Sequence, residues 1–354
     1  MNEAKRRYVA DGRLVLRGSM QDPLVQQHAG RGTGLVYLML NLPFFCNYTC
    51  LKCCNLLEDT QPSVRPRSDI CLDREKTAQV ISGASETGIK VLVVAGEGEP
   101  LLHPDFTWLL DRTVEAGLLP YVFTNGSRLT DENIKFLANK RASIIVSMDS
   151  LDPAKYQQLT GGEKGGDLRV LLKNIEKCRA GFSALIEPRN GIRIGSLALN
   201  MVVTKLNYEE VSKIKAFCGD DVVFVSNQPT RIGLGERNWE HLYGTLPHNP
   251  DVDAALANVA ASQRPLGTTS DGSWCAYMRN GMSVSSDGRV ITCAYSLETA
   301  GGYSPLNTRD LVAANMEVMA SVNKFYETSG HHRCILRHPK YKQFVNILHA
   351  ERAA

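Results

Sequence analysis

Three cysteines near the start of the chain, Cys46, Cys50 and Cys53, are the residues whose type and spacing point most directly to chemistry. Three residues separate the first two and two residues separate the second and third, so all three thiols lie on one short segment. Three thiolates can hold three irons of a four-iron, four-sulfur cluster and leave the fourth iron without a protein ligand. An iron with a vacant position can bind a small molecule, so the segment predicts a catalytic cluster.

A zinc site is the main alternative for this segment. Short Cys-x-x-Cys pairs are common in zinc sites, which normally need a fourth ligand nearby. Cys54 is next to Cys53 and would have to bend back sharply to bind the same metal. We therefore interpret Cys54 as a packed thiol.

The elements that must position these cysteines alternate between strand-length apolar runs and amphipathic stretches. This alternation is typical of parallel strand–helix units. Six units indicate an α/β fold with a partial (β/α)6 TIM-type barrel, whose chemistry would sit at the C-terminal ends of the strands. The expected strands are Leu35–Leu42, Lys90–Ala95, Leu119–Thr124, Ser143–Met148, Ile192–Thr204 and Val222–Ser226. The expected helices are Leu72–Thr87, Phe106–Ala116, Asp131–Ala138, Leu168–Ala180 and Tyr208–Phe217.

The composition of the chain limits which classes of protein it can belong to. A chain of 354 residues with 43% hydrophobic content can bury a large core. The formal charge of +3, with no run of five basic residues, does not favour nucleic acid as a partner. Without a long apolar stretch or an apolar signal segment, we expect a cytoplasmic protein with no membrane partner. Ten cysteines in such a chain indicate metal sites rather than disulfides.

The spacing of Cys46, Cys50 and Cys53 resembles the signature of the radical S-adenosylmethionine (radical SAM) superfamily. The resemblance implies that the vacant iron binds the amino and carboxylate groups of S-adenosylmethionine. An electron from the cluster would then cleave this cofactor into methionine and a 5′-deoxyadenosyl radical, which removes a hydrogen atom from the substrate. It also implies an electron donor such as flavodoxin or ferredoxin. The residue before the third cysteine is usually aromatic in this family and shields the adenine, and here it is Lys52.

Further resemblances follow the expected strands. Gly96-Glu97-Gly98-Glu99-Pro100 resembles the family's Gly-Gly-Glu-Pro motif, with Glu97 in place of the first glycine. A carboxylate supplies a charge-assisted acceptor for an ammonium group, so Glu99 is expected to contact the cofactor's amino group. Asn200, within the fifth expected strand, is either a cofactor contact or a structural hydrogen bonder. The expected cofactor-binding residues are Gly96, Gly98, Glu99, Thr124, Asn125, Ser147 and Asp149.

A second cysteine group resembles the auxiliary-cluster motif of SPASM and twitch domains. A turn at Gly288 between Met282–Ser285 and Arg289–Thr292 predicts a hairpin that would bring Cys275 and Cys293 together. The resemblance implies a second 4Fe–4S cluster. Three buried structural cysteines are the alternative.

Cys334 would supply the third thiolate of that cluster. His331 stands where four-cysteine members of the twitch type have another cysteine. Either His331 binds the fourth iron through its imidazole, which iron–sulfur proteins allow, or that iron is open to substrate.

Four segments follow from these patterns: an N-terminal extension at 1–33, the barrel at 34–227, a connecting region at 228–269 that covers the barrel mouth, and an auxiliary-cluster domain at 270–354 built from a hairpin and a helix. The connecting region contains one expected helix, Val252–Ala261.

The leading hypothesis is a radical SAM oxidoreductase acting on a small polar metabolite, of sugar, aminocyclitol or nucleoside type, with the auxiliary cluster accepting the second electron. A single auxiliary cluster resembles the dehydrogenases of aminoglycoside assembly and also the cyclase of molybdenum cofactor synthesis. That cyclase usually has a glycine-rich C-terminal tail, and the segment Leu348–Ala354 does not resemble it. The alternatives are a redox-neutral epimerase or decarboxylase, a peptide-modifying maturase, and a non-catalytic iron–sulfur or zinc-binding protein. Substrate contacts are expected from Arg231, Glu236, Arg237 and Trp239.

Overall fold

The structure is a computed structural model. It describes residues 12–29, 34–42, 46–54, 72–95, 98–162, 165–227, 230–243, 250, 253–254, 280–286, 288–291, 293 and 308–329. Some residues named above lie outside the described ones: Gly96, Glu97, Cys275, His331, Cys334 and most of the expected helix Val252–Ala261.

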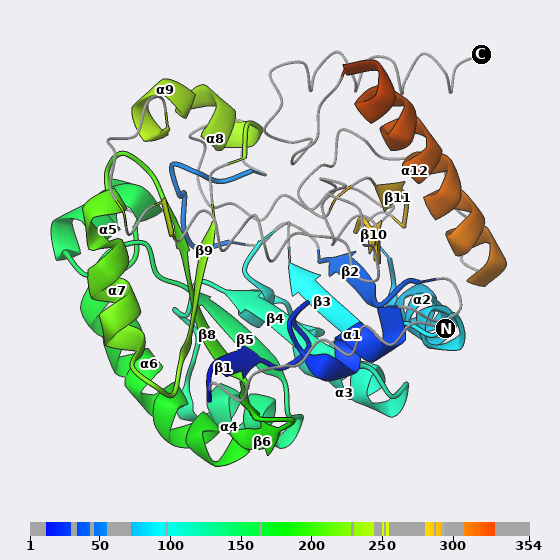
Figure 1. The fold of residues 1–354 in the computed structure, drawn as a ribbon, viewed down its shortest axis with the longest axis horizontal. Helices are drawn as coiled ribbons and strands as arrows, with labels where there is room; N and C mark the ends of the chain where they lie inside the picture. The colour runs from blue at the N-terminus through cyan, green and yellow to red at the C-terminus, as the bar shows by residue number, and fades with distance from the viewer. Residues whose placement is uncertain are drawn as a thin grey trace.

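One curved sheet of eight strands organises the molecule (Figure 1). Its order is β11-β10-β2-β3-β4-β5-β8-β9, and all neighbours are parallel except the β10–β11 pair. The six expected strands are present in the expected order, which confirms the partial barrel. Their bounds are β2 (Tyr37–Asn41), β3 (Val91–Ala95), β4 (Leu119–Thr124), β5 (Ser143–Ser147), β8 (Leu197–Val202) and β9 (Val223–Asn227), followed by β10 (Gly281–Val284) and β11 (Val290–Ile291).

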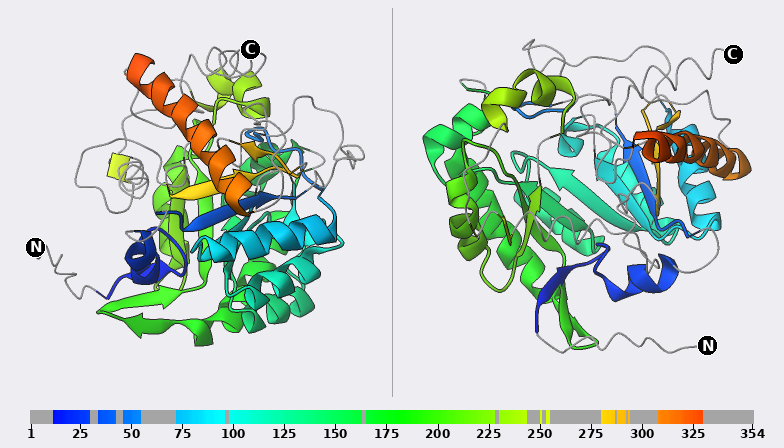
Figure 2. Two further views of the ribbon diagram at one scale, coloured as in Figure 1. Left: turned by 90° about the vertical axis from the view of Figure 1, so that its right-hand side faces the viewer. Right: turned by 45° about the horizontal axis from the view of Figure 1, so that its top comes forward.

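Helices cover the outer face of the sheet (Figure 2, right). Several begin at a side chain that accepts a hydrogen bond from the first turn, as Asp73, Thr130 and Asp167 do. The covering helices are α2 (Arg74–Glu86), α3 (Phe106–Glu115), α4 (Asp131–Asn139), α5 (Pro153–Thr160), α6 (Leu168–Phe182) and α7 (Val211–Cys218), with short 3-10 turns η1 (Pro100–Leu102), η3 (Ser183–Leu185) and η4 (Tyr208–Glu210).

The strands are apolar on both faces because both faces are covered. In β2, Leu38 and Leu40 belong to the cluster under the helices, whereas Tyr37 and Met39 face the inside of the barrel. The segment before β2 contributes β1 (Leu14–Leu16) and α1 (Pro23–Ala29). Apolar residues of α1 pack with Tyr37 in the inner cluster, and the Tyr37 hydroxyl donates a hydrogen bond to the Gly18 carbonyl at 3.0 Å.

The expected strand Ile192–Thr204 is divided into two. β7 (Ile192–Gly195) joins a separate sheet with β1 and β6 (Glu187–Arg189), and only β8 enters the barrel. At the division, buried Ser196 accepts a hydrogen bond from Arg17, and Gly195 lies against Leu14. Gly195 and Ser196, where the chain bends between the two strands, are the only local break in an otherwise strand-like run.

The expected C-terminal hairpin is present as β10 and β11. The Gly288 amide donates to the Ser285 carbonyl, and Gly288 has a φ of +84°, which favours glycine in this turn. β10 pairs with β2 in parallel, so the hairpin extends the barrel sheet itself. α12 (Thr308–Ser329) lies beside β11 and α2 and buries Val318 and Val322 (Figure 2).

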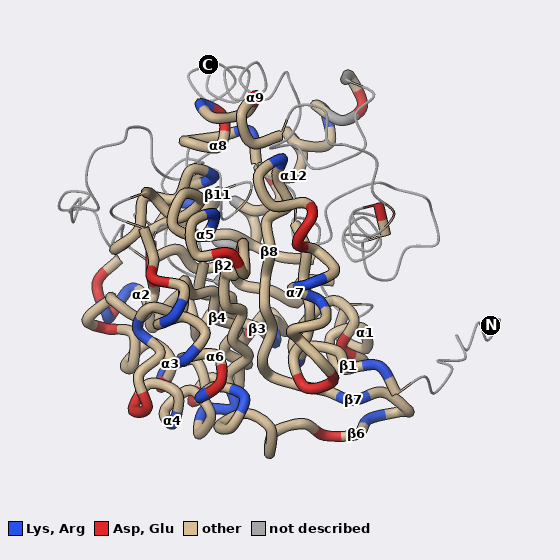
Figure 3. The backbone as a smooth tube through the Cα atoms, turned by 90° about the vertical axis from the view of Figure 1, so that its left-hand side faces the viewer, with Lys and Arg blue, Asp and Glu red and all other residues tan. Residues whose placement is uncertain are grey.

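No helix among the described residues is both long and apolar enough to span a membrane. Lys and Arg are interspersed with Asp and Glu along the described backbone (Figure 3).

Candidate functional site

The three-cysteine loop follows β2 at the C-terminal end of the sheet. The Cys53 amide donates to the Cys50 carbonyl at 3.0 Å, which closes a tight turn between two of the cysteines. Two further backbone bonds, from Thr49 to Thr160 at 3.2 Å and from Leu51 to Leu159 at 3.0 Å, attach the loop to the end of α5. The loop is therefore fixed to a covering helix of the barrel.

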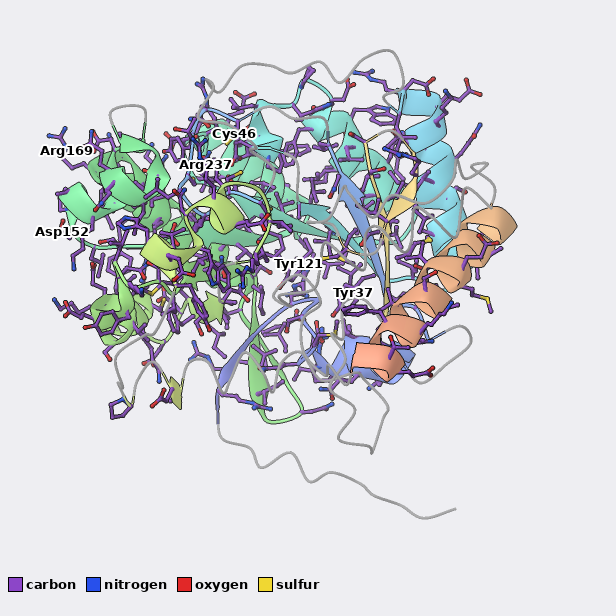
Figure 4. The ribbon with its side chains drawn as sticks, turned by 90° about the horizontal axis from the view of Figure 1, so that it is seen from above. Tyr37, Cys46, Tyr121, Asp152, Arg169 and Arg237 are labelled. Carbon is purple, nitrogen blue, oxygen red and sulfur yellow. The ribbon has the colours of Figure 1, made fainter. Side chains whose placement is uncertain are left out.

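A second attachment comes from α8 (Gly233–Arg237) and α9 (Trp239–Leu242), which lie above the strand ends (Figure 1). The Gly235 amide donates to the Cys53 carbonyl at 3.3 Å, and the Asn238 side chain donates to the Leu51 carbonyl at 2.9 Å. A Cβ on Gly233 would lie 2.5 Å from the Cys54 carbonyl oxygen, so only glycine permits this contact. Cys46 and Arg237 occupy the same part of the view from above (Figure 4).

Burial raises the pKa of two loop thiols, those of Cys46 and Cys50. The pKa of Cys46 rises to about 12, first through desolvation and further through the charges of Glu99 and Cys53. The pKa of Cys50 is well above its usual value for the same first reason, although Lys52 lowers it. Thiolates at these positions therefore need a cationic partner, which bound iron would provide.

Glu99 lies across from the loop and is 3% exposed. Its carboxylate accepts hydrogen bonds from the Thr124 hydroxyl at 2.6 Å, the Asn125 amide at 2.6 Å and the Leu101 amide at 3.2 Å. Desolvation raises its pKa to about 7 despite these three bonds. A bound ammonium would stabilise the charged form, as the sequence analysis expected for this residue.

Asn125 connects the end of β4 to the cysteine loop. Its side-chain amide donates to the side-chain oxygen of Asn47 at 2.9 Å and lies 4.0 Å from the Cys46 sulfur. The side-chain amide of Asn47 donates in turn to the Ser127 hydroxyl at 3.0 Å. The structure thus brings Cys46, Glu99, Thr124 and Asn125 together.

The end of β5 supplies an interaction that the sequence analysis missed. Asp149 forms an ion pair with Lys52 of the cysteine loop and accepts a hydrogen bond from the Val202 amide at 3.0 Å. Ser147 is half-buried and pairs through its backbone with Asn200, whose side-chain oxygen accepts a hydrogen bond from Asn227 at 2.6 Å. The Asn200 side chain thus links β8 to β9.

Cys293, just beyond β11, lies within electrostatic reach of the cysteine loop. The pKa of Cys54 is well above its usual value, first through burial and then through the neighbouring Cys53 and Cys293. Cys293, of the second expected cysteine group, therefore lies within electrostatic range of Cys54, the residue after the third cysteine of the loop.

Among the described residues, no group of three or more His, Cys, Asp and Glu side chains is arranged to hold a single metal ion. Of the expected substrate contacts, Arg231 stacks over the Trp239 ring at 5.2 Å.

Comparison with known proteins decides the family. A sequence profile described as the radical SAM superfamily matches residues 40–218, about half of the chain, including the cysteine loop, Glu99 and Asp149. The chain belongs to the radical SAM superfamily. Membership implies a 4Fe–4S cluster and S-adenosylmethionine as cofactors of a radical SAM enzyme.

Two relatives of different named function are similar to this chain in sequence. The chain is 27% identical over 197 residues to the tungsten-containing aldehyde ferredoxin oxidoreductase cofactor-modifying protein of Pyrococcus furiosus, covering 54% of this chain and 51% of that protein. It is 32% identical over 149 residues to the GTP 3′,8-cyclase of Tolumonas auensis, covering 41% of this chain and 42% of that protein. The chain thus covers about half or less of the length of these relatives.

Two solved structures have the same fold. Streptococcus suis SuiB bound to S-adenosylmethionine matches with a TM-score of 0.54 at 15% identity, covering 82% of this chain and 66% of that one. The structure of anSMEcpe with bound AdoMet and the Cp18Cys peptide matches with a TM-score of 0.54 at 14% identity, covering 90% of this chain and 97% of that one.

The described residues of this radical SAM chain fit a cluster and its cofactor. Three thiols share one anchored loop, and the raised pKa values of Cys46 and Cys50 mean that their thiolates need positive charge nearby. The buried Glu99 carboxylate likewise lacks a cationic partner in its three hydrogen bonds, all of which come from neutral donors.

Proposed function

We propose that this radical SAM enzyme reductively cleaves S-adenosylmethionine and removes a hydrogen atom from a small polar metabolite. The observation that carries the proposal is the anchored loop of Cys46, Cys50 and Cys53 facing the buried carboxylate of Glu99. When bound, the cluster supplies one electron to the cofactor, whose carbon–sulfur bond breaks to give methionine and a 5′-deoxyadenosyl radical.

The protein's own residues would hold the cofactor in place. Cys46, Cys50 and Cys53 would bind three irons, and Glu99 would accept hydrogen bonds from the cofactor's ammonium group. Thr124 and Asn125 orient that carboxylate by donating to it. Gly98, beside Glu99, and Ser147, at the end of β5, line the same end of the barrel.

We assign oxidation of the substrate to a second cluster at Cys275, Cys293 and Cys334, with His331 as an additional ligand. The substrate radical would lose one electron to this cluster and one proton to the medium, completing a two-electron oxidation. Cys293 lies within electrostatic range of Cys54, next to the third cysteine of the loop, which supports a second centre near the first. A sugar, aminocyclitol or nucleoside is the substrate class we favour, and the relatives named GTP 3′,8-cyclase support a nucleoside-like compound.

A peptide substrate is the second candidate. The solved structures of the same fold include SuiB bound to the precursor peptide SuiA and anSMEcpe with a bound peptide. Deuterium transfer separates the two candidates: small polar compounds deuterated next to a heteroatom, and deuterated peptides, are incubated with enzyme, reductant and cofactor. Deuterium in 5′-deoxyadenosine from the small compounds supports our proposal, and deuterium only from peptides contradicts the substrate class.

A further inference from the structure

A buried ion pair lies directly beside the cysteine ligands. Lys52, located between Cys50 and Cys53 in the sequence, pairs with Asp149, and their side chains are 12% and 2% exposed. Burying two charges costs desolvation energy that their mutual attraction roughly offsets, so apolar residues of similar size would serve stability equally well. Stability alone does not explain why this loop carries a cation.

The barrel holds the Asp149 carboxylate in place. The Val202 amide donates to this carboxylate at 3.0 Å. The Asn207 side chain donates to the backbone carbonyls of both Asp149, at 2.8 Å, and Val202, at 3.0 Å. This arrangement fixes the acidic partner at the end of β5, and the acidic partner fixes the ammonium group.

Among the described residues, the ion pair with Asp149 is the interaction that the structure gives the Lys52 ammonium. The Nζ atom is buried. Lys52 belongs to the cysteine loop itself, next to Cys53 and two residues from Cys50, whereas Asp149 belongs to the end of β5. The ammonium is therefore the charge of this pair that the loop carries beside its cysteines.

We propose that Lys52, held by Asp149, raises the reduction potential of the cluster bound at Cys46, Cys50 and Cys53. The inference rests on the proposed function, because it requires a cluster at these cysteines. Reduction adds one negative charge to the cluster, and a cation in a partly desolvated site stabilises that charge. A unit charge at this range changes the ratio of reduced to oxidised cluster by roughly tenfold or more at a fixed potential.

A redox titration of reconstituted protein tests this role. The reduced cluster is detected by its electron paramagnetic resonance signal, and the signal of the first cluster is identified because it changes on addition of S-adenosylmethionine. Lys52→Met is expected to lower the reduced-to-oxidised ratio roughly tenfold at the wild-type midpoint, whereas Lys52→Arg keeps the charge and stays within roughly threefold of wild type. Asp149→Asn removes the opposing charge and is expected to raise the ratio. Lys140→Met, in a surface ion pair with Asp111, is the matched control.

A wild-type ratio in Lys52→Met, or equal ratios in Lys52→Met and Lys52→Arg, would overturn the inference. If the Lys52→Met protein loses its iron, the Asp149→Asn variant provides the test. An increased ratio of reduced to oxidised cluster in Asp149→Asn supports the proposal, and an unchanged ratio overturns it. Iron content and cofactor cleavage are measured on the same samples. A wild-type protein without cluster or cleavage contradicts the proposed function, whereas normal iron and cleavage with unchanged ratios contradict only the role of Lys52.

Discussion

At the scale of single residues, Glu99 is the group whose environment is most specifically arranged. Burial raises its pKa to about 7 from an ordinary 4.5. Because its pKa is higher in the folded protein, Glu99 contributes stability below about 4.5, and this contribution is lost as the pH rises through about 7. Cofactor binding has the opposite dependence, since an ammonium group needs the carboxylate.

We therefore expect S-adenosylmethionine to bind more weakly to the reconstituted protein as the pH falls through about 7. Calorimetric titrations on either side of this pH measure the affinity. Glu99→Gln should weaken binding by roughly tenfold to a hundredfold, the value of a charge-assisted hydrogen bond, and should remove the pH dependence in this range. A Glu99→Gln protein with wild-type affinity and wild-type pH dependence would contradict the assigned role.

The residues of this site differ in how far the sequence could predict them. The spacing of Cys46, Cys50 and Cys53 and the motif at Glu99 are local signals that a single segment carries. The pairing of Lys52 with Asp149 joins the cysteine loop to the end of β5, and no local pattern records such a contact. The unusual lysine before the third cysteine was the one available signal.

At the scale of elements, α5 positions the cysteine loop, and this helix was not among those predicted from the sequence. Its signals are local: Asp152 accepts a hydrogen bond from the Lys155 amide, Pro153 occupies the first turn, and Gly161 ends the helix. The division of the apolar run into β7 and β8, in contrast, depends on the pairing of β7 with β1 and β6, and Gly195-Ser196 is only a weak local signal for it.

The end of α5 gives a test of loop anchoring. A Cβ on Gly161, which has a φ of +124°, would lie 2.2 Å from the Thr49 hydroxyl oxygen and 3.1 Å from the Thr49 backbone. Gly162 has a φ of +65° and no atom within 4 Å of such a Cβ. We expect Gly161→Ala to displace the cysteine loop and lower the iron content of the first cluster.

Gly162→Ala is the matched control, because it shares the strained backbone without the collision. It should cost about 1–2 kcal/mol of folding stability and keep its iron. Iron and sulfide analysis after reconstitution, together with thermal unfolding, measures both effects. Equal iron contents in the two variants would contradict the anchoring role of α5.

At the scale of the whole molecule, the C-terminal hairpin joins the barrel sheet through β10 and β2. The sequence predicted the hairpin from its turn, but not its partner strand, since pairing between distant segments leaves no periodic signal. This pairing and the nearness of Cys293 to Cys54 support two centres in one continuous structure.

Iron counting tests the second centre. Two 4Fe–4S clusters require roughly eight irons per chain. Replacing Cys275, Cys293 and Cys334 with alanine should leave roughly four irons. The same triple replacement at Cys46, Cys50 and Cys53 is the reciprocal control and should also leave roughly four. Roughly four irons in the intact protein would remove the second cluster from our proposal.

Cleavage of S-adenosylmethionine is the most direct test of the proposed activity. Reconstituted protein, incubated anaerobically with a reductant, should convert S-adenosylmethionine into 5′-deoxyadenosine. Cys46→Ala should abolish this product because it removes one iron ligand, whereas Cys178→Ala, at a buried cysteine of the barrel core, should retain it. Failure of the reduced, iron-loaded wild-type protein to form 5′-deoxyadenosine, or equal formation by Cys46→Ala, would contradict the central claim.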